Sequence, residues 1–254
     1  MKHTTITSTW IASPRWAEGW PILNGAAPPP RPGVWVIDPE PAYAALGNRS
    51  THLLASNELA RASRFVQPAH RIRYKATHTI LRMLLAGSSG TDDAASLRFT
   101  AGHHNKPQLS NGNAGTPAFN VSYTEGKSII GIADGPAIGV DIEWQHRPMV
   151  IDDMLPACFS PDEINYITAD PGKMRSRFFT LWTRKEAILK LTGEGIGDHL
   201  PLFEVLDGES IAERRIIGGH PPERIYLHSF LLGDDYVACY AATSPLTELT
   251  VYQL

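Results

Sequence analysis

The feature that most constrains this chain is a run of alternating apolar and acidic residues near its middle. Residues 138–144 read Ile-Gly-Val-Asp-Ile-Glu-Trp, and successive side chains of a β-strand point to opposite faces. One face therefore carries both carboxylates, Asp141 and Glu143, about 7 Å apart. Two ionised acids at that distance repel each other. The strand must either leave an acidic face in solvent, as many antiparallel strands do, or hold a cation there.

A helix predicted over Arg175–Thr192 carries a second group of charges. Its C-terminal stop is Gly193. Glu186 and Lys190 lie four residues apart, so they share one side of the helix. They either form a solvent-facing ion pair worth about 0.3 kcal/mol, or they bring a third carboxylate and an ammonium to the acidic strand. In the second case the site would suit Mg²⁺ and a phosphate-bearing substrate.

Composition narrows the classes of partner. The chain has 254 residues, 43% of them apolar, and a net charge of −3. It can bury one large core or two smaller ones, and it has no global attraction for nucleic acid or an anionic membrane. Two cysteines without metal-type spacing, no long apolar run and no signal-like N-terminus favour a reduced, cytoplasmic protein.

The order of predicted elements divides the chain into three parts. Residues 1–32 read as a Pro-rich extension, residues 33–136 as an N-terminal half, and residues 137–254 as a C-terminal half. Each half contains strands and helices, so the predicted class is α+β with two similar halves. The predicted strands are 34–37, 97–100, 119–123, 129–133, 137–144, 202–206, 225–231, 236–242 and 249–253.

Two further helical segments and one hairpin complete this prediction. Residues 57–85 form a helix with a break near Pro68, and Ser160 caps a helix over residues 161–167. Asp134-Gly135 is a typical tight turn, so residues 129–133 and 137–144 are predicted to pair as a hairpin.

Isolated basic residues are the candidates for phosphate contact. Arg offers a bidentate fork and Lys a mobile point charge. The candidates are Arg61, Arg64, Arg71 and Lys106. The His103-His104 pair lacks partners at metal spacing and is interpreted as loop. The sequence contains neither a Gly-rich P-loop nor a nucleophile elbow.

Six motifs in a fixed order resemble the 4′-phosphopantetheinyl transferase family, in its larger single-chain branch of two similar halves. The strand and the helix are the most specific of them, and the resemblance spans about residues 34–206. The motifs are Ala69-His70-Arg71, Asn105-Lys106-Pro107, Phe119-Asn120-Val121-Ser122-Tyr123, Gly139-Val140-Asp141-Ile142-Glu143, Phe159-Ser160-Pro161-Asp162-Glu163, and Phe179–Lys190 with its Trp-x-x-Lys-Glu-Ala-x-x-Lys core.

The resemblance implies a role for each matching residue. Asp141, Glu143 and Glu186 would hold Mg²⁺, and Glu186 would also take the proton from a carrier-protein serine, directly or through water. Lys190 would stabilise charge on the transferred phosphate, and Glu163 would support the metal site. The implied contacts to the phosphates of coenzyme A, in part from the basic candidates above, are Arg64, Arg71, Lys106, Ser122, Tyr123, Lys185 and Lys190.

Two positions depart from the family pattern. Asn105 stands where Gly is usual, a mild change because Asn also tolerates positive φ. Tyr123 stands where His is usual, and a neutral phenol can only donate a hydrogen bond to a phosphate that an imidazolium could also attract by charge.

The implied activity is transfer of the 4′-phosphopantetheine arm of coenzyme A to an apo acyl or peptidyl carrier protein, with release of 3′,5′-ADP, by a monomer. Coenzyme A would lie in the cleft between the halves. Two alternatives remain open: a non-catalytic protein of the same fold that binds coenzyme A or a carrier domain, and an unrelated Mg²⁺-dependent phosphohydrolase.

Overall fold

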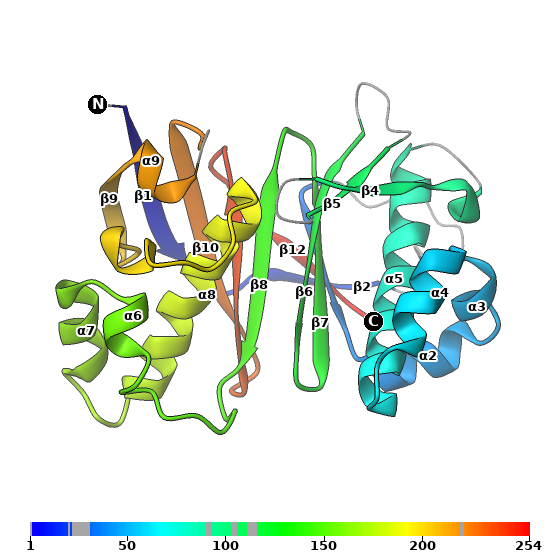
Figure 1. The fold of residues 1–254 in the computed structure, drawn as a ribbon, viewed down its shortest axis with the longest axis horizontal. Coiled ribbons are helices and arrows are strands. Elements are labelled where there is room, and N and C mark those ends of the chain that lie inside the picture. The colour runs from blue at the N-terminus through cyan, green and yellow to red at the C-terminus, as the bar shows by residue number, and fades with distance from the viewer. Residues whose placement is uncertain are drawn as a thin grey trace.

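The computed structural model describes residues 2–19, 21, 31–89, 93–102, 106–110, 116–218 and 221–254, and it has the predicted mixed α+β class. Two five-stranded sheets occupy its centre (Figure 1). In spatial order, sheet A contains β8 (Ile138–Trp144), β11 (Tyr236–Ala242), β10 (Arg224–Leu232), β1 (His3–Trp10) and β9 (Gly208–Glu213). Sheet B contains β2 (Arg15–Glu18), β12 (Thr250–Gln253), β3 (Gly33–Ile37), β7 (Lys127–Ala133) and β6 (Ala118–Thr124).

Helices cover the outer face of each sheet (Figure 1). The long helix α8 (Met174–Thr192) packs on sheet A, and the long helix α5 (Pro68–Ser89) packs on sheet B. The shorter elements near α8 are α6 (Leu155–Cys158), α7 (Pro161–Thr168), the 3-10 turn η3 (Leu200–Leu202) and α9 (Arg214–Ile217). Those near α5 are α2 (Pro39–Leu46), α3 (Arg49–His52), α4 (Ser56–Ser63) and the 3-10 turn η1 (Ala94–Ser96). A two-stranded ribbon, β4 (Phe99–Ala101) with β5 (Pro107–Leu109), lies beside sheet B (Figure 1).

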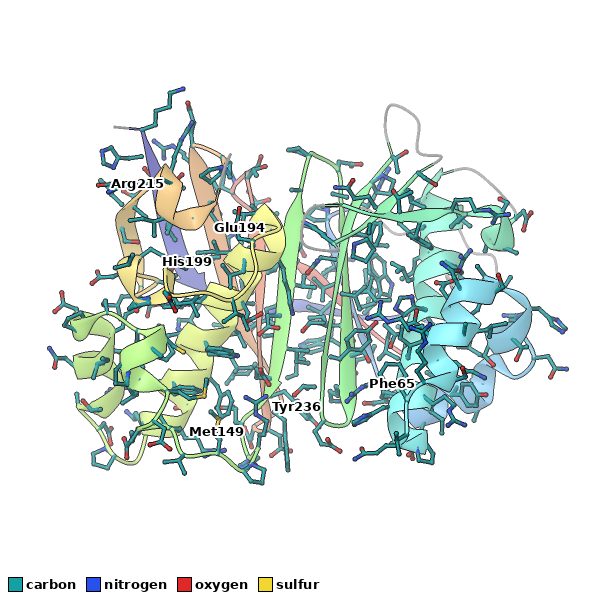
Figure 2. All side chains as sticks on the ribbon, viewed as in Figure 1. Phe65, Met149, Glu194, His199, Arg215 and Tyr236 are labelled. Atoms are coloured by element: carbon teal, nitrogen blue, oxygen red, sulfur yellow. The ribbon has the colours of Figure 1, made fainter. Side chains whose placement is uncertain are left out.

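Three apolar cores hold these layers together, and side chains fill the space between the sheets (Figure 2). One core lies between α8 and sheet A, a second between α5 and sheet B, and a third between the two sheets. Strand β8 serves two cores at once because its side chains alternate. Val140 and Ile142 enter the core between the sheets, so Asp141 and Glu143 must face α8.

The two sheets also meet at their edges, where β6 lies against β8. The backbone N–H of Val140 donates to Asn120 Oδ1 at 2.9 Å, and the backbone N–H of Trp144 donates to Thr124 Oγ1 at 3.0 Å. Side chains of β6 thereby satisfy the outer edge of β8, which would otherwise be an unpaired sheet edge.

Local signals in the sequence are confirmed at several boundaries. Helix α5 begins at Pro68, as the predicted break requires. Ser160 and Glu163 form a capping box at the start of α7. Gly193 ends α8 with a φ of 80°, the left-handed conformation that favours glycine.

The predicted hairpin between residues 129–133 and 137–144 is wrong. Strand β7 pairs with β3 and β6 in sheet B, whereas β8 pairs with β11 in sheet A. The turn at residues 134–136 therefore carries the chain from one sheet to the other. An Asp-Gly signal predicts a turn but does not decide whether the next strand stays in the same sheet. The predicted strand over residues 202–206 is also absent, and β9 forms a few residues later.

The chain ends cross between the sheets, which the expected N-terminal extension did not anticipate. Strand β1 lies between β10 and β9 in sheet A, and the C-terminal β12 lies between β2 and β3 in sheet B. Strand β1 was overlooked because its buried positions, Thr4, Ile6 and Ser8, include only one large apolar residue. The domain boundaries proposed near residues 33 and 137 stay a prediction. Residues 22–30 of the proposed extension lie outside the described part.

Candidate functional site

The site forms where α8 lies against β8, and Gly139 makes this contact possible. A Cβ atom at Gly139 would lie 2.0 Å from the carbonyl oxygen of Ala187 and 2.7 Å from the backbone nitrogen of Leu191. No side chain fits at such distances. The glycine thus lets the backbone of the helix touch the strand, which brings Asp141 and Glu143 against the side chains of α8.

Asp141 is the centre of a hydrogen-bonded cluster built from three elements. Its side chain is buried, and its Oδ1 accepts from Ser122 Oγ of β6 at 2.7 Å and from Lys190 Nζ of α8 at 2.6 Å. Lys190 Nζ also donates to Ser122 Oγ at 2.7 Å. The cluster therefore joins both sheets to the helix. Lys190 keeps a side-chain exposure of 26%, so its ammonium can still reach a ligand.

Glu186 lies close enough to this cluster to feel its charges, but Lys190 forms its ion pair with Asp141 and not with Glu186. Burial, the Asp141 charge and the Glu143 charge raise the pKa of Glu186 to about 7, although the Lys190 charge opposes them. The lysine pairs with Asp141 in the structure, and no ion pair joins it to Glu186 within the described residues. The alternative of a solvent-facing Glu186–Lys190 pair is therefore wrong.

Glu143 is the third acid, and its oxygens already have partners. Oε1 accepts from Trp182 Nε1 at 3.1 Å, and Oε2 accepts from Thr124 Oγ1 at 3.3 Å and Arg147 Nη1 at 3.5 Å. Burial, and then the Asp141 charge, raise the pKa of Glu143. Both strand acids are buried, so the alternative of a solvated acidic face is also wrong.

Two carboxylate oxygens in the cluster lack any partner in the part of the chain that the structure describes. They are Asp141 Oδ2 and Glu186 Oε1, and both are buried. Unpaired buried acceptors are costly, and a divalent cation would satisfy them. Within the same residues no three His, Cys, Asp or Glu side chains are arranged as a metal cage. Two carboxylates nevertheless suit Mg²⁺, which usually keeps several waters and binds substrate phosphate.

Lys185 and Glu163 lie away from this cluster. Lys185 is fully buried and pairs with Glu163 Oε2 at 2.8 Å, and its Nζ also donates to the carbonyl oxygens of Leu200 and Phe203. Glu163 in turn accepts from the backbone N–H groups of Ser160 and Val205. The structure therefore does not bring Lys185 to a position where it could contact a phosphate, and it does not bring Glu163 to the acids.

Three further predicted contacts to coenzyme A lie on the sheet B side, namely Arg64, Arg71 and Tyr123. Arg64 and Arg71 are exposed near the junction of α4 and α5, and Arg71 Nη2 donates to the carbonyl oxygen of Phe65 at 3.0 Å. Tyr123 is 37% exposed at the end of β6. The guanidinium of Arg73 lies over its ring, 5.9 Å from the centroid. Arg73 was not among the predicted contacts, although it lies only two residues from Arg71.

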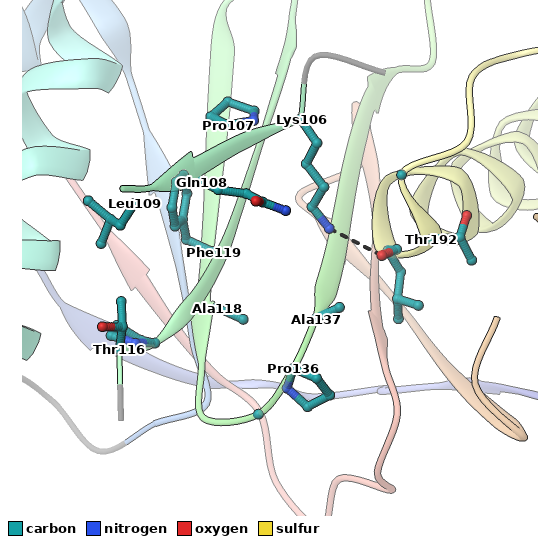
Figure 3. Close-up of a pocket in the computed structure, with 14 residues that line it drawn as sticks. Lys106, Pro107, Gln108, Leu109, Thr116, Ala118, Phe119, Pro136, Ala137 and Thr192 are labelled. Atoms are coloured by element: carbon teal, nitrogen blue, oxygen red, sulfur yellow. Dashed lines mark hydrogen bonds between the residues drawn. The ribbon is translucent and has the colours of Figure 1, made fainter. Parts of the chain in front are cut away.

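Lys106 binds the backbone of the two elements that carry the acidic cluster, and among the described residues none of its hydrogen bonds goes to the acids themselves. Its Nζ donates to the backbone carbonyls of Ile138 and Leu191 at 3.1 and 3.2 Å. The side chain crosses one end of a cavity of about 420 Å³, lined in part by Gln108, Phe119 and Thr192 (Figure 3). Its sequence neighbours His103, His104 and Asn105 lie outside the described residues.

Thr124 and Trp182 also belong to the site, but no role was predicted for them. Both hold Glu143. Their positions carried a signal: Thr124 lies two residues after Ser122, on the same face of β6, and Trp182 lies one helical turn before Glu186.

Comparison with known proteins gives a consistent family. A family model described as the 4′-phosphopantetheinyl transferase superfamily matches residues 137–241. A protein of Synechocystis sp., provisionally named as a 4′-phosphopantetheinyl transferase, is 31% identical over 189 residues, which are 72% of this chain and 73% of that protein. A 4′-phosphopantetheinyl transferase of Nostoc sp. is 34% identical over 145 residues, 56% of this chain and 61% of its own. Another from Bacillus subtilis is 26% identical over 212 residues, 81% of this chain and 89% of its own.

Proposed function

Since the chain belongs to the 4′-phosphopantetheinyl transferase superfamily and is a transferase, we propose that it moves the phosphopantetheine arm of coenzyme A to a serine of an apo carrier protein. The observation that carries the proposal is the cluster of Asp141, Ser122 and Lys190 beside Glu186, a carboxyl group whose pKa burial raises. It combines hard acceptors for a cation, a donor for phosphate and a carboxylate that can accept a proton.

The unpaired oxygens Asp141 Oδ2 and Glu186 Oε1 are the proposed ligands of Mg²⁺. When bound, the ion would offset charge on the phosphates of coenzyme A. Glu143, the third proposed ligand, has both oxygens in hydrogen bonds, so we assign it mainly the role of fixing Trp182 and adding negative charge beside Asp141. These assignments rest on unsatisfied acceptors and on charge.

In the proposed reaction the serine oxygen of the carrier forms a bond to the β-phosphorus of coenzyme A. The bond from that phosphorus to the bridging oxygen breaks, and 3′,5′-ADP leaves with the electron pair. Glu186 accepts the serine proton, a role that a carboxylate can fill when it is positioned at the attacking hydroxyl. Lys190, whose ammonium has a third donor beyond those given to Asp141 and Ser122, donates a hydrogen bond to the transferred phosphate. Ser122 could do the same only by turning its one hydroxyl hydrogen away from Asp141. Positioning supplies much of the acceleration.

The remaining predicted contacts to coenzyme A differ in how accessible their side chains are to a phosphate. Arg64, Arg71 and Tyr123 are accessible, and we keep them as proposed contacts to coenzyme A. Lys185 is buried in its pair with Glu163, so nothing in its surroundings supports such a contact. A monomer in the cytoplasm is also a proposal. The two free cysteines, Cys158 and Cys239, support the reducing compartment. Within the described residues no helix is long and apolar enough to cross a membrane.

The test is the intact mass of an apo carrier domain after incubation with this protein, coenzyme A and Mg²⁺. We expect a gain of one phosphopantetheine arm, which EDTA or a serine-to-alanine change in the carrier abolishes. Fatty-acid, polyketide and peptide carriers are compared in parallel. No gain with any of them, while coenzyme A still binds, would instead indicate a binding protein. Release of phosphate from small esters without a carrier would indicate a hydrolase.

A further inference from the structure

We infer that Lys106 is a positioning residue, which holds β8 and α8 together at the acidic cluster and does not bind the phosphates of coenzyme A. The inference deepens the proposed transferase function and rests on it where catalysis is concerned. The Lys106 side chain reaches from the sheet B side of the molecule to both elements that carry the cluster.

The two acceptors of Lys106 lie in different elements, one in β8 and one in α8, so the lysine fixes these elements relative to each other. Ile138 is the first residue of β8 and precedes Asp141 by three positions, while Leu191 directly follows Lys190 in α8. The ammonium donates to both backbone carbonyls, at 3.1 and 3.2 Å. A single charged group therefore bridges the strand that carries Asp141 and the helix that carries Glu186 and Lys190.

The base of the lysine is itself anchored. Lys106 directly precedes β5, which pairs with β4. The backbone N–H of Gly102 donates to the carbonyl oxygen of Lys106 at 2.8 Å. A Cβ at Gly102 would lie 3.1 Å from that carbonyl oxygen, which is a tight contact, so glycine favours this approach. The β4–β5 ribbon thus holds the lysine on the sheet B side, and its side chain spans the junction to sheet A.

Helix ends explain why a cation is stabilised at this point. The last four carbonyls of an α-helix lack intrahelical donors, and Leu191 provides one of them. Positive charge at a helix C-terminus is favoured by the helix dipole. Burial nevertheless lowers the pKa of Lys106 to about 8. Two of the three N–H donors of the ammonium bind backbone carbonyls, as expected for a side chain that links two elements.

Loss of the link that Lys106 makes between β8 and α8 should change the relative positions of the groups in the acidic cluster. Gly139 leaves no space between β8 and the backbone of Ala187, so α8 cannot move closer to the strand, and a displacement of its last turn would have to run along the strand. A shift there moves Lys190 relative to Asp141. Small misplacements of catalytic groups reduce rate steeply while leaving binding of the substrate largely intact.

The experiment compares Lys106→Met with Lys173→Met, a change at an exposed lysine just before the other end of α8. Three quantities are measured: kcat and KM for coenzyme A, the Kd for coenzyme A without carrier, and amide hydrogen exchange. For Lys106→Met we expect kcat to fall roughly ten- to a hundredfold, with the Kd changed less than about twofold. Exchange at residues 138–141 and 189–193 should become faster. Lys173→Met should change none of these.

A conservative variant keeps the inference testable if Lys106→Met does not fold. Lys106→Arg retains the positive charge and the donors but alters their reach, so it should recover folding and part of kcat, again without a large change in Kd. The inference is overturned if either variant raises KM and Kd together with kcat intact, which would mark a phosphate contact. It is also overturned if exchange and kcat both stay at wild-type values.

Failure of the transferase proposal would be visible separately. If the wild-type protein modifies no carrier, the proposed function fails. The exchange comparison between Lys106→Met and Lys173→Met still decides whether Lys106 joins the two elements, because it requires no turnover.

Discussion

At the scale of single residues, Asp141 links the elements of the acidic cluster, because its Oδ1 accepts from both Ser122 of β6 and Lys190 of α8. The shared face of Asp141 and Glu143 follows from strand geometry, and the shared side of Glu186 and Lys190 follows from helix geometry. The partners within the cluster did not follow. A sequence gives no distance between β6 and α8, so the bonds from Lys190 to Asp141 and Ser122 required the fold.

Lys185 shows that a residue adjacent to a site residue in the sequence need not belong to the site. Adjacent residues of an α-helix project about 100° apart, so Lys185 and Glu186 cannot both face the acids. Helix geometry alone could have separated them. What sequence could not supply is the pairing of Lys185 with Glu163 and with the carbonyls of Leu200 in η3 and of Phe203 just after it.

The first prediction concerns Glu186. We expect Glu186→Gln to lower transfer by about 10²–10⁴-fold, because loss of a positioned base removes that much rate, while coenzyme A binding stays measurable. The single-turnover rate of carrier modification is the measurement. Glu209→Gln, at an exposed position of β9, is the matched control. Unimpaired transfer by Glu186→Gln would remove this residue from the mechanism.

At the scale of elements, caps and turns set boundaries correctly, whereas pairing depended on tertiary structure. Pro68, the capping box at Ser160 and the left-handed Gly193 each act within a few residues of chain. The partner of β8 is β11, almost a hundred residues later, and local signals carry no information about that choice. The position of α8 also depends on a distant group, since Glu163 at the start of α7 neutralises Lys185 in the helix interior.

The second prediction tests this buried pair. Lys185→Met should lower the free energy of unfolding by about 3–5 kcal/mol, because it leaves the Glu163 carboxylate buried without a counter-charge. Chemical denaturation of the metal-free protein measures it. Changing both residues, as Lys185→Met with Glu163→Leu, should cost less than Lys185→Met alone, since no lone charge remains. A double variant less stable than Lys185→Met would contradict the explanation.

Across the whole molecule, the two chain ends tie the sheets together. Strand β1 completes the sheet that carries the acids, and β12 pairs with β2 and β3 on the other side. Tyr252 of β12 stacks on Trp35 of β3, with ring centroids 5.0 Å apart. Composition and periodicity predicted the α+β class, but the exchange of terminal strands was not predictable, because pairing between the first and last strands with distant partners leaves no local pattern.

The third prediction asks whether residues 3–10 belong to the folded body. Ile6 is fully buried at the middle of β1, so Ile6→Ala should lower the free energy of unfolding by about 2–4 kcal/mol. Ile211→Ala is a closely matched control. Ile211 lies on the neighbouring β9, opposite Thr5, and is 73% exposed, so its loss should cost less than about 0.5 kcal/mol. A separate N-terminal extension would predict no effect from Ile6→Ala. A large effect from that variant alone therefore assigns β1 to the core that supports α8 and, through it, to the geometry of the acidic cluster.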